Sequence, residues 1–250
     1  LGHQGYGVVS EERAIPIPDG LDSRDASLAY LCSWSVSALH LGEYAAAETV
    51  VVVGMGLVGS SAALVADLNG ARVLALDADP ARVAFARTLG LGAVELAGGE
   101  GADERIAAFL GETGPDLIIE TSGSWHGFRQ AVNLARDYSR IAVMGIYRNP
   151  PPADLGLTLF GETFGFPSKF HYRRIKIVGC GSDPDVIVEP MPRMATKRRN
   201  FAYVLEQAAR GRLPLGKLVT QALPPDQIET ALATMARGDR SNVGMVFEWT

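Results

Sequence analysis

Cysteine is scarce in this sequence, and several patterns that mark particular classes of protein are absent. Cys32 and Cys180 are the only cysteines among 250 residues and lie far apart, so a reduced, cytoplasmic setting is the default expectation. No apolar run approaches the roughly 18 residues of a membrane-spanning helix, and no signal peptide is recognisable. We therefore expect a cytoplasmic protein with no membrane partner.

Positive charge is also sparse. The net charge is −5, and the basic runs Arg173-Arg174 and Lys197-Arg198-Arg199 are interpreted as solvated or interface charges. Nucleic acid is therefore not an expected partner. The sequence also has no Ser-His-Asp order, no paired carboxylate motif and no Walker lysine, so the reactions that those patterns indicate are not expected.

The residues that are abundant indicate a folded chain. Hydrophobic residues make up 47% of the sequence, and the mean hydropathy is +0.11. The length allows one large domain or two small ones. The most informative stretch is residues 49–59, TVVVVGMGLVG. Four consecutive valines predict a buried strand, the glycines predict a tight turn, and the apolar residues of 57–68 share one face of a predicted helix.

Each glycine of this turn has a role in binding a dinucleotide. Gly54 permits the tight turn, Gly56 lets a pyrophosphate approach the backbone, and Gly59 lets the helix pack on the sheet. The helix N-terminus attracts the phosphates. Asp77 ends the next predicted strand, where it can bind ribose hydroxyls and repel a 2′-phosphate, so we expect NAD in preference to NADP. The alternative is a glycine-rich turn in some other α/β protein.

The remaining pattern predicts an α/β fold with a doubly wound, six-stranded parallel sheet. Strands are expected near residues 50, 73, 94, 117, 141 and 176, with helices between them. Asp25 is expected to cap a helix over 26–40, and 148–171 is expected to be irregular. The phenylalanines of that section, Phe160, Phe164, Phe166 and Phe170, are expected to fill a core or a dimer seam.

The C-terminal part predicts two more strands, over 217–223 and 243–249, with a helix before each, over 197–211 and 225–237. Neither strand has an obvious partner in the chain. Unpaired strands would be exposed edges, which proteins usually cover, so missing chain or a partner is expected there.

From Gly2 to Trp249 the sequence resembles the medium-chain dehydrogenase/reductase family, which includes zinc alcohol and polyol dehydrogenases. The resemblance is carried by several segments in order: Val9–Leu21, the unit from Gly54 to Asp77, Glu120-Thr121-Ser122-Gly123, Val143-Met144-Gly145, Gly179-Cys180-Gly181-Ser182, and Gly238–Trp249.

This resemblance implies NAD-dependent hydride transfer between an alcohol (a polyol, sugar or secondary alcohol) and its carbonyl, with the cofactor carrying the chemistry. It implies a homodimer through the sheet edge near Arg174–Val178. Residues 1–40 would end the catalytic domain and connect it to a Rossmann domain over 41–205, and 206–250 would return to the catalytic domain. The implied cofactor-binding residues are Gly54, Gly56, Leu57, Val58, Gly59, Asp77, Arg82, Ser122, Met144, Gly145, Ile146, Cys180 and Ser182.

The sequence departs from the family in its N-terminal half. The family has a GroES-like domain there that supplies most of the zinc ligands, and this sequence, which starts at Leu1, holds only remnants of that β domain. Zinc is therefore expected only together with that missing half. His3 stands in a Gly-His-Gln run similar to the family's Gly-His-Glu, but Gly2–Val9 fits a later strand better. Cys32 is a weak candidate metal ligand, and a small buried thiol is the alternative.

The catalytic residues are left unknown, with His40, Tyr147 and His171 as weak candidates. His40 could instead be a cation at a helix end, and packing is the alternative role for His171. His126 is interpreted as a surface residue or a neighbour of the nicotinamide. Two classes of function remain open: an oxidoreductase acting on a small alcohol or carbonyl, and a non-catalytic NAD-binding module or half of a split enzyme.

Overall fold

The chain forms two compact units. A computed structural model describes residues 3–11, 14–165, 167–181, 196–237 and 239–249. One unit is Trp34–Ser182, and the other combines Leu1–Ser33 with Asp183–Thr250. The expected divisions after residues 40 and 205 stay predictions. None of the described helices is long and apolar enough to cross a membrane.

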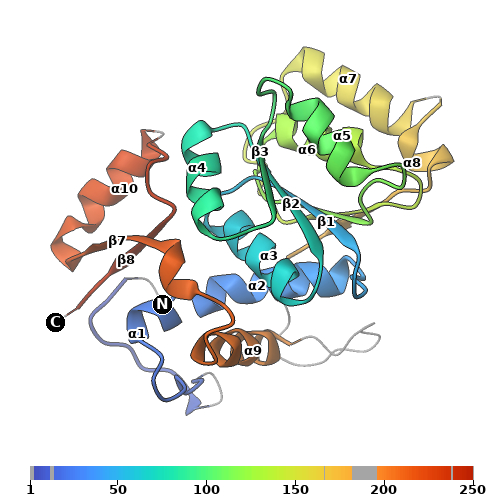
Figure 1. Ribbon diagram of the computed structural model, residues 1–250. Coiled ribbons are helices and arrows are strands. Elements are labelled where there is room, and N and C mark those ends of the chain that lie inside the picture. The colour runs from blue at the N-terminus through green and yellow to red at the C-terminus, as the bar shows by residue number, and fades with distance from the viewer. Residues whose placement is uncertain (1–2, 12–13, 166, 182–195, 238, 250) are drawn as a thin grey trace. The chain divides into compact units, whose positions relative to one another are not determined.

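A six-stranded parallel sheet forms the centre of the Trp34–Ser182 unit, as the sequence predicts. The strand order is β3-β2-β1-β4-β5-β6, and every neighbouring pair is parallel. The direction of strand addition reverses between β1 and β4, which makes the sheet doubly wound. Figure 1 labels β1, β2 and β3, which form one half of this sheet. The strands are β1 (Thr49–Val53), β2 (Arg72–Asp77), β3 (Ala93–Leu96), β4 (Leu117–Glu120), β5 (Arg140–Val143) and β6 (Lys176–Gly179).

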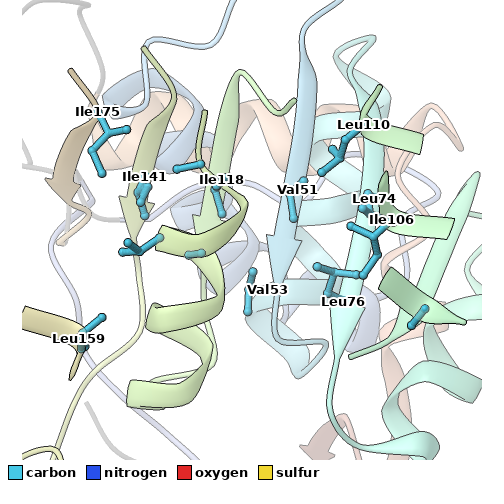
Figure 2. Packing of buried hydrophobic residues seen from close by; sticks show 14 residues of the cluster. Val51, Val53, Leu74, Leu76, Ile106, Leu110, Ile118, Ile141, Leu159 and Ile175 are labelled. Atoms are coloured by element: carbon cyan, nitrogen blue, oxygen red, sulfur yellow. The ribbon is translucent and has the colours of Figure 1, made fainter. Parts of the chain in front are cut away.

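Both faces of this sheet are covered. Alternate residues of each strand point to opposite sides, and in β1 the residues of both sets are buried. On one face Val51 and Val53 of β1 join a buried cluster with Ile106 of α5, Val132 of α6 and Leu159 of α7 (Figure 2). The alternate valines of β1 are buried as well, on the face opposite this cluster. The helices are α3 (Leu57–Leu68), α4 (Pro80–Thr88), α5 (Ala102–Leu110), α6 (Trp125–Leu134) and α7 (Ala153–Phe164).

The expectation that 148–171 is irregular is wrong. The section contains α7 and the short helix α8 (Lys169–Tyr172). The prolines suggested a loop, but Pro152 stands just before α7, where proline does not disturb a helix. Leu155 and Leu159 are buried one turn apart on its inner face. Phe160, Phe164 and Phe170 are exposed and do not fill the core, and Phe166 lies outside the described residues.

The predicted helix over 26–40 is divided in two. The short helix α1 (Ser23–Ala26) precedes α2 (Ala29–Leu41). The cap of α1 is Asp22, whose side chain accepts a hydrogen bond from the backbone N–H of Arg24 at 2.7 Å. Asp25, the expected cap, lies inside α1 instead.

The other unit corrects the expectation about the last two strands. β7 (Val219–Leu223) and β8 (Gly244–Phe247) pair with each other in a two-stranded parallel sheet. Helix α10 (Ile228–Ala236) lies between them in the chain, so the segment forms a βαβ unit. The remaining elements are α9 (Lys197–Ala209) and the 3₁₀ helices η2 (Leu215–Leu218) and η3 (Pro225–Gln227).

Truncating a core leucine should be far more costly than truncating an exposed one. Leu74 of β2 is 0% exposed, whereas Leu157 of α7 is 79% exposed. We expect Leu74→Ala to lower the free energy of unfolding by about 2–5 kcal/mol, because it removes buried methyl groups and leaves a cavity. The matched variant Leu157→Ala should change it by less than about 0.5 kcal/mol. Urea unfolding followed by circular dichroism measures both, and equal effects would contradict this packing.

Candidate functional site

The carboxyl ends of the parallel strands bring the predicted cofactor residues to one edge of the sheet. Val53, at the end of β1, pairs with Leu76 of β2 on one side and with Glu120 of β4 on the other. Glu120 pairs in turn with Val143, and Val143 pairs with Gly179. The glycine turn, Asp77 and the segments that follow β4, β5 and β6 therefore share this edge. Ligands of open α/β sheets bind at such an edge, where the strand order reverses.

In the turn after β1, two glycines lie so close to the backbone of other residues that no side chain would fit. Gly54 has φ +97°, and a Cβ placed there would lie 2.9 Å from the Cα of Ser122. A Cβ on Gly59 would overlap the carbonyl oxygen of Gly54 and would lie 2.6 Å from Oγ1 of Thr121. These contacts allow α3 to start directly against β1 and β4.

Gly56 differs from its two neighbours because a Cβ there would meet nothing within 4 Å. It is the N-cap of α3 and has no side chain that could cap the helix. The N–H groups of the first helical turn, which includes Leu57 and Val58, are therefore available to an anion and carry the positive end of the helix dipole. Open space and uncapped N–H groups fit the pyrophosphate of a dinucleotide.

Asp77 lies across the glycine turn at the end of β2. Its Oδ2 accepts a hydrogen bond from the N–H of Met55 at 2.5 Å, and its Oδ1 accepts one from the N–H of Asp79 at 2.8 Å. A carboxylate has about four acceptor positions, so capacity for two ribose hydroxyls remains. Asp79 caps α4 by accepting from Ala81 at 2.8 Å, and Arg82 lies half-buried in the first turn of that helix.

Thr121 and Ser122 connect the end of β4 to this turn. The hydroxyl of Thr121 lies 3.0 Å from the carbonyl oxygen of Val53 and 2.9 Å from that of Gly54. The Ser122 hydroxyl bonds to Glu120 and accepts from the N–H of Ser124 at 3.1 Å. The hydroxyl of Ser122 and its backbone N–H, which donates to Oε1 of Glu120 at 2.7 Å, are thus both used within the protein.

Buried Glu120 and half-buried Tyr147 form a hydrogen-bonded pair at the same edge. The Tyr147 hydroxyl donates to Oε2 of Glu120, and the Tyr147 ring packs 4.5 Å from the ring of Trp125, measured between centroids. Burial, reinforced by the hydrogen bond to Glu120, raises the pKa of Tyr147 well above its usual range. Tyr147 is therefore a neutral hydrogen-bond donor at physiological pH.

The other predicted nicotinamide-side residues follow β5 and β6. The N–H groups of Met144 and Gly145 both donate to the Glu120 carbonyl, at 2.8 and 3.0 Å, and Ile146 beyond them is 69% exposed. The N–H of Cys180 donates to the Val143 carbonyl at 2.8 Å, which continues the β5–β6 pairing past the end of β6. Ser182 lies outside the described residues.

The structure does not bring the three weak catalytic candidates together. Tyr147 lies at the carboxyl edge of the sheet. His171 is exposed on α8, shortly before β6 starts, so it belongs to the opposite edge. His40 is in the last turn of α2, close in sequence to Gly42, whose Cβ position adjoins Leu117 at the amino end of β4. His126 is exposed in the first turn of α6, after the Ser122–Gly123 turn.

The described residues include no group of three histidines, cysteines or carboxylates that could hold a metal. Cys32 is fully buried in α2, eight residues before His40, a separation of about 12 Å along a helix. The ring of His3 packs beside those of Phe247 and Trp249. The part of the chain that the structure describes therefore does not fit a zinc ion by itself.

Sequence reasoning did not single out Glu120 and Thr121 as site residues. They belong to the run Glu120–Gly123 that carries the family resemblance, of which Ser122 is the predicted site residue. The available signal was the position of Glu120 at the end of an apolar parallel strand, where both faces are covered.

Known proteins share this arrangement of sequence and structure. Residues 58–182 match the sequence profile of the zinc-binding dehydrogenases. The chain belongs to the zinc-binding dehydrogenase family. This confirms the resemblance to zinc-type alcohol and polyol dehydrogenases. L-galactonate-5-dehydrogenase from Escherichia coli K12 is 27% identical over 230 residues, which are 90% of this chain and 60% of that protein.

Solved structures show the same fold. Galactitol-1-phosphate dehydrogenase from Escherichia coli superposes with a TM-score of 0.74 at 19% identity, over 94% of this chain and 63% of that one. The short chain alcohol dehydrogenase rspB from Escherichia coli CFT073, solved with NADH, superposes with a TM-score of 0.70 at 19% identity, over 96% of this chain and 64% of that one. The chain thus spans about 60% of the length of these relatives of the family.

The glycines of the turn should differ in their tolerance of alanine. Gly59→Ala should destabilise the chain by about 1–3 kcal/mol, because the added methyl group overlaps the backbone of Gly54. Gly56→Ala should cost less, about 0.5–1 kcal/mol, because the methyl group enters open space and only the preference of an N-cap for glycine over alanine is lost. Thermal unfolding of the two variants measures the difference. A larger loss for Gly56→Ala would contradict this geometry.

Proposed function

We propose that this chain is the cofactor-binding part of an NAD-dependent dehydrogenase that transfers hydride between an alcohol and its carbonyl. The observation that carries the proposal lies at the reversal point of the sheet, where an uncapped helix N-terminus with open space at Gly56 lies beside the carboxylate of Asp77. Ligands of open α/β sheets bind in the crevice that such a point forms. Phosphate and ribose are the two chemical groups that such an arrangement binds.

The residues of the chain then have separate roles. The N–H groups of Leu57, Val58 and Gly59 would hold the pyrophosphate, and Asp77 would accept hydrogen bonds from the adenosine ribose. Arg82 would lie near the adenine. The nicotinamide, when bound, supplies the hydride chemistry. The segments that would surround it are Ser122, Met144–Ile146, Cys180 and Ser182.

NAD is proposed over NADP because of the negative charge at Asp77. A 2′-phosphate would lie against this carboxylate, and like charges at that distance repel. The substrate is proposed to be a polyol, sugar or secondary alcohol, in keeping with relatives named as dehydrogenases of L-galactonate and galactitol-1-phosphate. Zinc, if used, would need ligands from beyond the described residues.

Two further elements of the proposal concern assembly and location. β6 is the last strand of the sheet and leaves one edge unpaired within the sheet, so a homodimer through Arg174–Val178 is proposed. Neither cysteine forms a disulfide within the described residues, in keeping with the proposed cytoplasmic setting. A non-catalytic NAD-binding module or half of a split dehydrogenase would contain the same crevice, and the comparisons do not favour it over the enzyme.

Titration with NADH and NADPH, followed by nicotinamide fluorescence, tests the cofactor proposal. Wild-type chain should bind NADH saturably and more tightly than NADPH. Asp77→Asn should weaken NADH binding about tenfold and reduce the preference over NADPH, because one acceptor oxygen and the charge are lost. Asp79→Asn removes a charge two residues away and keeps a good helix cap, so it should change the Kd less than twofold.

The outcomes separate the parts of this proposal. No NADH binding by the folded wild-type chain would overturn the assignment of the glycine turn. Tighter binding of NADPH would leave the crevice in place but overturn the role of Asp77. Equal effects of Asp77→Asn and Asp79→Asn on the Kd would show that the affinity depends on the net charge near the site and not on a direct bond from Asp77 to the ribose.

A proline substitution tests the dimer. The backbone N–H groups of Lys176 and Cys180 donate toward β5. Successive N–H groups along a strand point to alternate sides, so the N–H of Ile177 points away from the sheet. If β6 pairs with its copy, Ile177→Pro should remove one intersubunit bond and shift the chain toward monomer in sedimentation equilibrium. Lys176→Ala, which keeps its backbone N–H, is the control. A wild-type chain that sediments as a monomer would contradict the proposal.

A further inference from the structure

The carboxylate of Glu120 is buried, and none of the described residues supplies a cation to it. Glu120 is 0% exposed, and its side-chain partners within the described part of the chain are Ser122 and Tyr147. Burying such a group is costly unless hydrogen bonds compensate for the lost water. A protein that needed only core volume at the end of β4 would place an apolar residue there, as it does at the three preceding positions, Leu117, Ile118 and Ile119.

Three donors converge on the two oxygens of this carboxylate. Oε1 accepts from the backbone N–H of Ser122 at 2.7 Å and from the Ser122 hydroxyl. Oε2 accepts from the Tyr147 hydroxyl, which stays protonated as described above. The site therefore needs a side chain with two atoms that both accept hydrogen bonds. A carboxylate has two acceptor oxygens, whereas an amide has only one.

Glycines make room for this arrangement. A Cβ on Gly145 would overlap Oε2 of Glu120, and one on Gly127 would lie 3.3 Å from Oε1 and would overlap the Ser122 hydroxyl. Gly127 belongs to α6 and Gly145 follows β5. Two separate segments thus lack side chains where the carboxylate and its partner lie.

The bonds of Glu120 join the two segments proposed to flank the nicotinamide. Ser122 belongs to the connection between β4 and α6, whereas Tyr147 directly follows Met144–Ile146 after β5. We propose that Glu120 is a positioning residue that sets the spacing of these two segments through Ser122 and Tyr147, and so holds the nicotinamide half of the cofactor site. This inference rests on the proposed cofactor function.

Parallel titrations of the 250-residue chain with NADH and with ADP-ribose, which lacks the nicotinamide, test the inference. Glu120→Gln should raise the Kd for NADH about tenfold, because an amide turns a donor toward Ser122 or Tyr147. The Kd for ADP-ribose should stay within about twofold, since Asp77 and the glycine turn are unchanged. Tyr147→Phe, which keeps the ring and removes one donor, should act in the same direction with a smaller effect.

Glu162→Gln is the matched control. It makes the same carboxylate-to-amide change in α7, where Glu162 pairs with Arg129 at 2.6 Å, away from the cofactor edge. It should leave both Kd values unchanged. The fluorescence enhancement of bound NADH is a second measurement: Glu120→Gln should reduce it at saturation, because the nicotinamide is held less firmly.

Several results would overturn the inference. Equal weakening of NADH and ADP-ribose would show that Glu120 only stabilises the fold, and no weakening would show that the spacing does not depend on it. Equal affinity of the wild-type chain for both ligands would show that these segments do not hold the nicotinamide, while leaving the cofactor proposal intact. Failure of the wild-type chain to bind either ligand would refute the cofactor proposal itself. If Glu120→Gln does not fold, Tyr147→Phe decides.

Discussion

The close approach of Gly54 to Ser122 is the contact on which the rest of the Trp34–Ser182 unit depends. At this point the end of β1, the start of α3 and the end of β4 meet within van der Waals distance, and no side chain could fit between them. The contact sets α3 directly behind the strand that it follows. It also places the helix N-terminus at the reversal point of the sheet, the position at which open α/β sheets bind their ligands.

Two carboxylates form the polar contacts along this edge of the sheet. At the end of β2, Asp77 accepts from backbone N–H groups of the glycine turn and of the loop before α4. On the other side, Glu120 accepts from Ser122 and from Tyr147. Both are carboxylates at the carboxyl ends of parallel strands, and each connects its strand to neighbouring loops. They differ in exposure: Asp77 is half-buried, whereas Glu120 is fully buried. Asp77 can therefore still reach a ligand.

Much of the sheet could be predicted from the sequence because its signals are local. A strand end is specified by four valines before a glycine turn. A helix start is specified by an acid followed by proline, at Asp79-Pro80, because of the conformations that those residues favour. The helix α7 is not predicted for the same reason, since the prolines before it and the glycines within it indicate a loop locally. Tertiary contacts stabilise it as a helix, among them the burial of Leu155 and Leu159 and the ion pair of Glu162 with Arg129. The pairing of β7 with β8 also escaped prediction, because a strand's partner is a property of the folded chain.

The sequence alone determined the fold class, the glycine turn and its acid, because each follows from backbone conformation, hydrophobic periodicity or charge at a known spacing. Only the tertiary structure decided which residues surround that turn. The partners of Glu120 are Ser122, two residues along the chain, and Tyr147, 27 residues along it. Tyr147 lies within reach of Glu120 because β5 pairs with β4. The physical reason is that strand pairing brings distant segments within hydrogen-bonding distance, and no local pattern records that distance.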